Sequence, residues 1–165
     1  MAKDNSFDIV SEVDVQEVDN AYQQAKRELA QRYDLKDSGS TIEFDKGTGT
    51  FTLSAPSEFV VNQVVDMLNG KLVRRKVDLK AVHWGDDQAA SGMTVRRQGT
   101  IVQGIDVDTA KKIAKDIRDQ KFKAKPLVEG DKLRVTSPSR DELQNVIAFV
   151  KEKDYGLPLQ FANYR

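Results

Sequence analysis

The pattern of apolar and polar positions along the chain changes its period several times, and each change predicts a new element. Residues 7–13 alternate between apolar and polar side chains with a period near two, which is typical of a strand buried mainly on one face. From Val15 to Leu29, apolar residues recur at spacings of three and four, which predicts a helix. Asp14 and Glu17 have the spacing of an N-terminal capping box, so we expect the helix to begin there.

The first half of the chain continues with a hairpin, a helix and a strand. Residues 41–45 and 50–54 are expected to pair around residues 46–49, because the two glycines of this turn readily supply a positive φ. Residues 57–68 have helical spacing, and residues 76–84 supply a fourth strand. The predicted order is therefore strand, helix, strand, strand, helix, strand.

The second half of the chain repeats this order. A helix is predicted from about Asp108 to Gln120, followed by a hairpin of residues 123–128 and 132–136. Ser139 and Glu142 have capping-box spacing at the start of the last helix. A short apolar strand closes the chain.

Two matches between the halves indicate an internal duplication. Residues 9–15 recur 92 residues later as residues 101–107, with four of the seven positions identical. Residues 51–57 match residues 133–139 at an offset of 82. Because the two matches occur in the same order along the chain, we interpret them as two copies of one unit.

These elements predict an α+β protein with two ferredoxin-like βαββαβ domains, residues 1–90 and residues 91–165, joined by a linker at residues 86–92. Right-handed crossovers place both helices of such a unit on one face of its sheet, so the other face is free to meet a partner. An exchange of strands between the copies, with the N-terminal strand packing in the second domain, is compatible with the same sequence.

Composition excludes several classes of protein. The 165 residues include no cysteine and one histidine, which excludes a disulfide scaffold and cysteine zinc sites and leaves little for histidine-based catalysis. No glycine-rich phosphate loop follows a strand, since Gly47-Thr48-Gly49 lies inside a hairpin. We therefore predict a binding protein and no enzyme, with no cofactor and no metal site.

Neither a membrane-spanning segment nor a leader is expected. No run of apolar residues approaches the length that a membrane span requires, and the first residues lack the apolar stretch of a signal peptide. The sequence thus predicts a cytoplasmic protein with no membrane partner.

Charge is shared unevenly between the halves, although 26 basic residues balance 26 acidic ones over the whole chain. Residues 1–90 contain 11 basic and 16 acidic residues, whereas residues 91–165 contain 15 and 10. The second hairpin carries several lysines and Arg134, and neither of its predicted strands contains an acid. This favours phosphate binding. The lysines of this phosphate or nucleic-acid patch are Lys111, Lys112, Lys115, Lys123, Lys125 and Lys132.

The alternative to phosphate binding is that the basic helix only presents a solvated surface, because aspartates at positions 108, 116 and 119 are interspersed there. Base stacking in the manner of RNA-recognition modules is not supported, since the exposed positions of the inner strands are threonine, serine, lysine and arginine. Stacking groups are available elsewhere, at Tyr33, Phe161 and Tyr164, although a role in the core is favoured for each.

Five stretches carry a resemblance to a known family: residues 6–12, 32–34, 134–136, 139–144 and 158–165. With these residues the chain resembles the bacterial YajQ family over nearly all of its length. The resemblance implies two ferredoxin-like domains, no established catalytic activity and nucleotide binding, in some members of cyclic di-GMP with a link to transcription. A nucleic-acid association is also implied. The chain departs from the family pattern at Leu35 and at Asp37. It also departs at Ser137-Pro138, where the family usually has a glycine followed by a lysine.

We therefore predict a non-enzymatic protein that binds a nucleotide or a cyclic dinucleotide, with cyclic di-GMP as the specific candidate. The predicted ligand-binding residues are Arg32, Tyr33, Arg134, Arg140, Gln160, Asn163 and Arg165. One alternative is an RNA-binding protein that uses the lysine patch on the RNA backbone. A second alternative is a protein-interaction module that modulates a transcription regulator.

Overall fold

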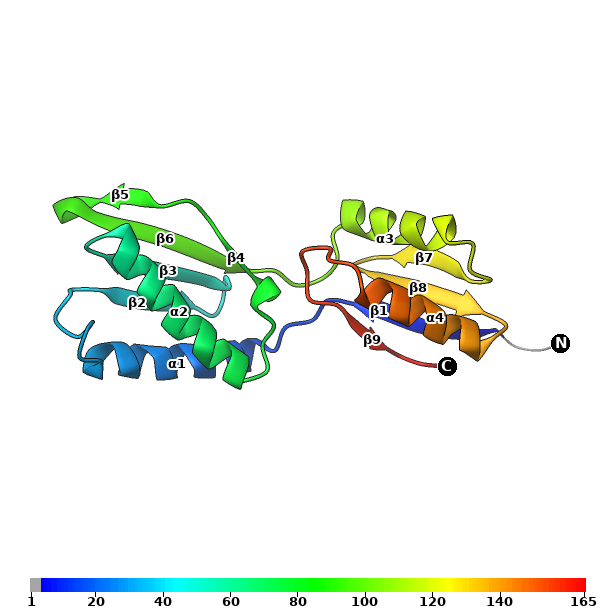
Figure 1. Cartoon of the computed structure of the whole chain (residues 1–165), viewed down its shortest axis with the longest axis horizontal. Helices are drawn as coiled ribbons and strands as arrows, with labels where there is room; N and C mark the ends of the chain where they lie inside the picture. Colours follow the sequence, from blue (N-terminus) through cyan, green and yellow to red (C-terminus); the bar gives the residue numbers. More distant parts are fainter. Residues whose placement is uncertain (1–3) are drawn as a thin grey trace. The chain divides into compact units, whose positions relative to one another are not determined.

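The computed structural model describes residues 4–165, which form two compact units (Figure 1). Unit 2 comprises Val13–Val102, and unit 1 comprises the N-terminal segment through Glu12 together with Gln103–Arg165. Within the described residues, each unit contains one antiparallel sheet and two α-helices. The predicted α+β class with two ferredoxin-like repeats is confirmed.

Unit 2 is built on a sheet with the strand order β2, β3, β6, β4, and a short β5 also pairs with β6. Its strands are β2 (Thr41–Asp45), β3 (Thr50–Ala55), β4 (Val82–Trp84), β5 (Gln88–Ala90) and β6 (Thr94–Ile101). Two helices, α1 (Val15–Gln31) and α2 (Glu58–Arg74), lie side by side over one face of the sheet (Figure 1). Two single 3-10 turns, η1 (Leu79–Ala81) and η2 (Ser91–Met93), precede β4 and β6.

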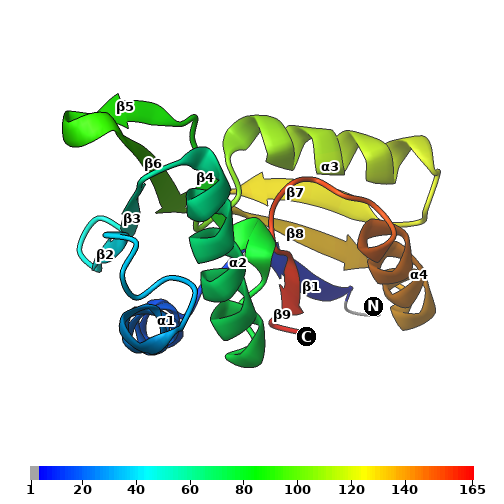
Figure 2. The same ribbon diagram turned by 60° about the vertical axis from the view of Figure 1, so that its left-hand side comes forward.

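Unit 1 has the same arrangement, with the strand order β7, β8, β1, β9. Its strands are β1 (Asn5–Val10), β7 (Lys125–Glu129), β8 (Lys132–Ser137) and β9 (Gln160–Ala162). Helix α3 (Val107–Asp119) runs along β7, as Figure 2 shows, and α4 (Arg140–Lys151) packs against β8 and β1.

The first strand of each repeat lies in the sheet of the other repeat. β1 pairs with β8 and β9, which places Phe7 opposite Val135. β6 pairs with β3 and β4, which places Gly99 between Phe51 and Trp84. The boundary expected between residues 90 and 91 therefore falls inside unit 2, where β5 is already paired with β6.

This exchange changes the charge of each compact unit. Residues 13–102 contain 12 basic and 13 acidic residues, a net charge of −1, and the rest of the sequence contains 14 and 13, a net charge of +1. The contrast of −5 and +5 between the sequence halves is wrong as a description of the folded units. The acidic N-terminal segment joins the basic repeat, and the basic residues 96 and 97 join the acidic repeat.

Strict alternation in β8 and β3 shows which side of each sheet is buried. In β8, Leu133 and Val135 are fully buried, whereas Lys132 and Arg134 remain partly exposed. β3 shows the same alternation, with Phe51 and Leu53 fully buried and Thr50 and Thr52 half-buried. We call the side that carries Lys132 and Arg134 the open face of unit 1, because α3 and α4 cover the other side.

Equivalent aspartates cap the first helix of each repeat. The Asp14 carboxylate accepts hydrogen bonds from the backbone N–H groups of Gln16 and Glu17, at 3.1 and 3.3 Å. The Asp106 carboxylate accepts one from the N–H of Thr109 at 3.1 Å. These caps are 92 residues apart, which is the offset of the first sequence match, so the duplication is visible at the level of single hydrogen bonds.

The strand predicted at residues 76–84 forms only over Val82–Trp84. The chain leaves α2 through Lys76, which has a left-handed φ of 61°, and Asp78 then caps the 3-10 turn η1. In the second repeat, the first strand runs over Thr94–Ile101, so only its last residue belongs to the segment 101–107 that matches residues 9–15. Its Gly99 lies under the Trp84 indole, where a Cβ atom would be 2.6 Å from the ring.

Candidate functional site

A pocket in unit 1 lies where β1, α4 and the last residues of the chain meet. Its volume is about 290 Å³. It is lined by Asn5, Ser6, Arg140, Leu143, Gln144, Tyr164 and Arg165. The structure thus brings together two of the predicted ligand-binding residues, Arg140 and Arg165. It also places the aromatic ring of Tyr164 in the same pocket.

The C-terminal segment reaches this pocket because it pairs with β1. The N–H of Ser6 donates to the carbonyl of Arg165 at 3.2 Å, and the N–H of Arg165 donates to the carbonyl of Ser6 at 2.9 Å. This pairing places the Tyr164 ring 6.2 Å from the buried Phe7 ring at an interplanar angle of 29°. Tyr164 keeps 60% of its surface exposed, so one face of the ring is available for a ligand.

Both guanidinium groups of the pocket are available to an anion. Arg140 is the first residue of α4, after the N-cap Ser139, and its Nε donates to the Asn5 Oδ1 at 3.2 Å. Within residues 4–165, neither Arg140 nor Arg165 forms an ion pair with an acidic side chain. Guanidinium groups bind phosphate oxygens in a bidentate manner, and they also stack on flat rings. The pocket therefore combines phosphate ligands with a stacking surface.

A buried carboxylate holds two other predicted residues. Asp8 is 1% exposed, and it accepts hydrogen bonds from the Arg134 Nε at 3.1 Å and from the Asn163 Nδ2 at 2.8 Å. Burial alone would raise the pKa of Asp8, but the hydrogen bonds from Asn163 and Arg134 outweigh burial and hold this pKa below its ordinary value. Asn163 thus ties the C-terminal segment to β1, Arg134 ties β8 to the same strand, and neither residue is among those that line the pocket.

The expectation that no acid opposes the basic groups of the second hairpin is wrong. Glu129 lies at the end of β7, and its carboxylate is 3.6 Å from Arg134. The second acid, Asp8, enters from the exchanged strand β1. Arg134 therefore already has two carboxylate partners.

The remaining predicted ligand-binding residues lie outside the pocket. The Gln160 Oε1 accepts from the N–H of Glu12 at 2.8 Å, which fastens the segment after β1. Arg32 and Tyr33 belong to unit 2, where Arg32 pairs with Asp34 at 2.8 Å. Tyr33 is 92% exposed, so the role in the core that was favoured for this ring is wrong.

The six lysines of the predicted patch are divided between two surfaces of unit 1. Lys111, Lys112 and Lys115 lie on the exposed side of α3, where Lys115 pairs with Asp119 at 2.8 Å. Lys125 and Lys132 lie on the open face, opposite Thr136 and Glu129 respectively, and Lys123 precedes β7. The helix lysines and the strand lysines therefore do not converge on one site.

Sequence reasoning missed Asp8, Asn5 and Gln144. Asp8 reads as an ordinary polar position of an alternating strand, and its partner Arg134 is 126 residues away. Asn5 meets Arg140 only because β1 lies in unit 1. Gln144 lies one turn after Arg140 on α4, so this i, i+4 spacing is the one local signal that could have pointed to it.

Residues 4–165 contain neither a candidate membrane-spanning helix nor a candidate cluster of metal ligands. None of the helices there is long and apolar enough to cross a membrane. That same stretch contains no group of three or more histidine, aspartate or glutamate side chains arranged to hold a metal ion.

Comparison with known proteins gave full-length matches. A family model described as nucleotide-binding protein YajQ-like matches residues 5–165. A protein of Koribacter versatilis named as a nucleotide-binding protein is 48% identical over 162 residues, which is 98% of each chain. Proteins named in the same way from Desulfitobacterium hafniense and Bacillus cereus are 47% and 48% identical over 165 residues, and the matches cover 100% of each chain.

Proposed function

The chain belongs to the YajQ family, and from this premise we propose that it is a non-enzymatic nucleotide-binding protein whose site is the pocket between β1, α4 and the C-terminal segment. One observation carries the assignment. Two guanidinium groups without acidic partners, Arg140 and Arg165, line the same pocket as the half-exposed ring of Tyr164. We leave Arg32 and Tyr33 out of this site, because they belong to the other unit and Arg32 is paired with Asp34.

Each lining group matches one part of a nucleotide. The arginines suit phosphate oxygens, and stacking of a base on an aromatic side chain contributes about 1–3 kcal/mol. The side-chain amides of Asn5 and Gln144 can both donate and accept, as recognition of a base edge requires. The chemistry of the pocket thus supports a ligand that is anionic at one end and flat at the other.

The size of the pocket bears on which nucleotide binds. A volume of about 290 Å³ is at the lower end of small-molecule sites, which suits one nucleotide. For cyclic di-GMP, the finer form of the proposal, one guanylate occupies the pocket and the other lies outside it. We therefore expect cyclic di-GMP to gain affinity over GMP only through contacts beyond the pocket rim.

Binding without catalysis is supported by the lining residues. None of the described residues that line the pocket is a histidine, aspartate, glutamate, lysine or cysteine. A general base near neutral pH, or a nucleophile activated by such a base, would have to come from these residue types. The groups that remain can bind and orient a nucleotide.

Calorimetric titration of the full chain with GMP, GTP and cyclic di-GMP tests the proposal. Arg140→Gln removes one phosphate ligand and should weaken binding about tenfold, the factor that corresponds to one charge-assisted hydrogen bond. Arg118→Gln is the matched control, because Arg118 is an exposed arginine of unit 1 on α3, outside the pocket. Equal affinity of the two variants for every nucleotide would remove the pocket from the proposal.

The two alternatives predict different results in the same experiment. Binding to the RNA backbone through the lysines would give an affinity for short RNA that falls steeply with salt and depends little on base. Modulation of a transcription regulator would require that the regulator bind the chain with an affinity that changes when nucleotide is added. Both stay predictions.

A further inference from the structure

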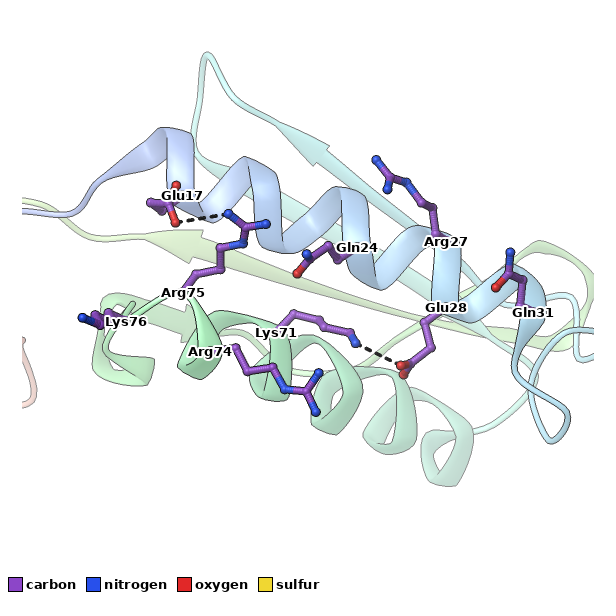
Figure 3. Close-up of a pocket in the computed structure, with 9 residues that line it drawn as sticks. All are labelled: Glu17, Gln24, Arg27, Glu28, Gln31, Lys71, Arg74, Arg75 and Lys76. Atoms are coloured by element: carbon purple, nitrogen blue, oxygen red, sulfur yellow. Dashed lines mark ion pairs between the residues drawn. The ribbon is translucent and has the colours of Figure 1, made fainter.

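A long groove runs between α1 and α2 on the outer surface of unit 2 (Figure 3). Its volume is about 670 Å³. The cations that line it are Arg27 from α1, Lys71 and Arg74 from the last turn of α2, and Arg75 and Lys76 just after that helix. Because both walls contribute, the groove carries positive charge along its length.

The groove is strongly basic within a nearly neutral unit. Its five cations face two carboxylates, an excess of three positive charges, whereas residues 13–102 together have a net charge of −1. Both carboxylates are used in bridges between the helices. Lys71 pairs with Glu28 at 3.0 Å, and Arg75 pairs with Glu17 at 3.5 Å (Figure 3). This leaves Arg27, Arg74 and Lys76 without an acidic partner in the part of the chain that the structure describes.

The dipole of α2 accounts for only part of this cluster. A helix C-terminus favours cations, which is sufficient to explain Lys71 and Arg74. It does not explain Arg27, because α1 has no basic residue in its last turn. If this surface were only exposed to solvent and bound nothing, cations from both helices would not be needed along one groove.

Lys76 occupies a position that ordinarily favours glycine. The N–H of Val77 donates to the carbonyl of Leu72, and the N–H of Lys76 donates to that of Val73, both at 3.0 Å, which is the Schellman pattern. Lys76 therefore needs the left-handed φ of 61°, a region that most side chains disfavour. A lysine at this position has a less favourable backbone conformation than a glycine would have, but it adds a cation to the end of the groove.

The arrangement of the cations indicates the shape of the ligand. In Figure 3 Lys71 and Arg75 project between the helices, Lys76 lies at the end of the groove, and Arg27 rises from α1 on the side away from α2, so the cations do not converge on one point. The Gln24 amide lies between the two bridging ion pairs and can donate to an oxygen. Such a spread of cations suits an extended anion with several charged groups more than a single phosphate.

We propose that the groove between α1 and α2 binds condensed phosphate, an anion of two or more linked phosphate groups. The linked phosphates span the groove, with Arg27 on one wall and Arg74 and Lys76 on the other. Inorganic triphosphate and the 5′-triphosphate tail of a nucleotide share this chemistry. The site lies in unit 2 and is separate from the nucleotide pocket of unit 1, so it goes beyond the proposed function.

Titration of the full chain with inorganic triphosphate and with orthophosphate tests this inference. We expect triphosphate to bind at least tenfold more tightly than orthophosphate, and the double variant Arg27→Gln, Arg74→Gln to lose about tenfold or more of the triphosphate affinity. Lys36→Gln, an exposed lysine of the same unit outside the groove, is the control and should keep the affinity. Absence of triphosphate binding, or equal losses in the double variant and the control, would overturn the proposal.

Lys76→Gly separates ligand binding from folding. Glycine relieves the left-handed backbone while it removes a cation, so the melting temperature should rise as triphosphate affinity falls. If Lys76→Gly binds triphosphate as tightly as the parent protein does, the result counts against a phosphate site in the groove.

Titration of the Arg140→Gln variant with GTP distinguishes inorganic triphosphate from the triphosphate tail of a nucleotide as the ligand of the groove. A loss of GTP affinity when Arg27→Gln and Arg74→Gln are added to this variant shows that the groove accepts a nucleotide tail, and an unchanged GTP affinity shows that the groove takes the inorganic anion.

Discussion

The Asp8 carboxylate accepts a hydrogen bond from the Nε of Arg134 at 3.1 Å, across a strand pair that joins the first strand of the chain to the second repeat. The same carboxylate holds Asn163, two residues before Arg165. One buried acid thus connects the strand exchange to the C-terminal segment that lines the proposed nucleotide site.

Asp8→Asn should destabilise the protein by about 1–3 kcal/mol. The amide keeps the shape of the side chain but loses the charge that two buried hydrogen bonds to Arg134 and Asn163 require. Chemical unfolding in urea measures the effect. Asp66→Asn, an exposed aspartate on α2, is the control and should stay within about 0.5 kcal/mol of the parent protein. A similar small change in both variants would show that the Asp8 network adds little.

The contribution of Asp8 should disappear in acid. Because the folded-state pKa of Asp8 lies below its ordinary value of 3.8, the stabilisation is fully present above that value and is lost as the pH falls through the lower folded-state pKa. The free energy of unfolding should therefore differ between the parent and Asp8→Asn at pH 7 and converge as the pH falls below 3.8. A difference that stays constant down to pH 2 would contradict the assignment of the charged form.

Gly99→Ala tests the exchanged strand of unit 2. A Cβ atom at this position would be 2.6 Å from the Trp84 ring, so the indole must move, at a cost of about 1–3 kcal/mol. Urea unfolding gives the loss of stability, and the fluorescence of Trp84, the one tryptophan of the sequence, reports its displacement.

Gly70→Ala is the matched control for that variant. Gly70 lies inside α2 with nothing within 4 Å of an added Cβ, so alanine should stabilise the protein by about 0.5–1 kcal/mol. Opposite signs for the two substitutions are expected. Stabilisation by Gly99→Ala would mean that Trp84 does not lie over β6 as described.

The sequence was sufficient to predict features that depend on neighbours in the chain. The caps at Asp14 and Ser139 and the hairpin turns are local, since each needs residues only two to four positions apart. The two offsets between the halves identified the repeat, and the repeat implied the fold class. These predictions did not require knowledge of which strands meet.

The sequence allowed an exchange of strands but could not decide it, because the alternation of β1 is satisfied by either sheet. Phe7 and Ile9 need an apolar neighbour on one side, and both β3 and β8 offer one. The pocket depends on that choice, since Asn5 and Arg165 meet Arg140 only when β1 lies beside β8. Arg140 and Arg165 were therefore candidates on residue type and family resemblance alone, whereas the Asp8 network was not anticipated.

Two exposed tyrosines offer the most direct test of where the nucleotide binds. Tyr164 lines the pocket, and Tyr33 is an even more exposed ring in the other unit. We predict that Tyr164→Leu, which keeps an apolar contact for Phe7, weakens nucleotide affinity in calorimetric titration about tenfold or more, while Tyr33→Leu leaves it unchanged. Loss of affinity in Tyr33→Leu with full affinity in Tyr164→Leu would contradict the account.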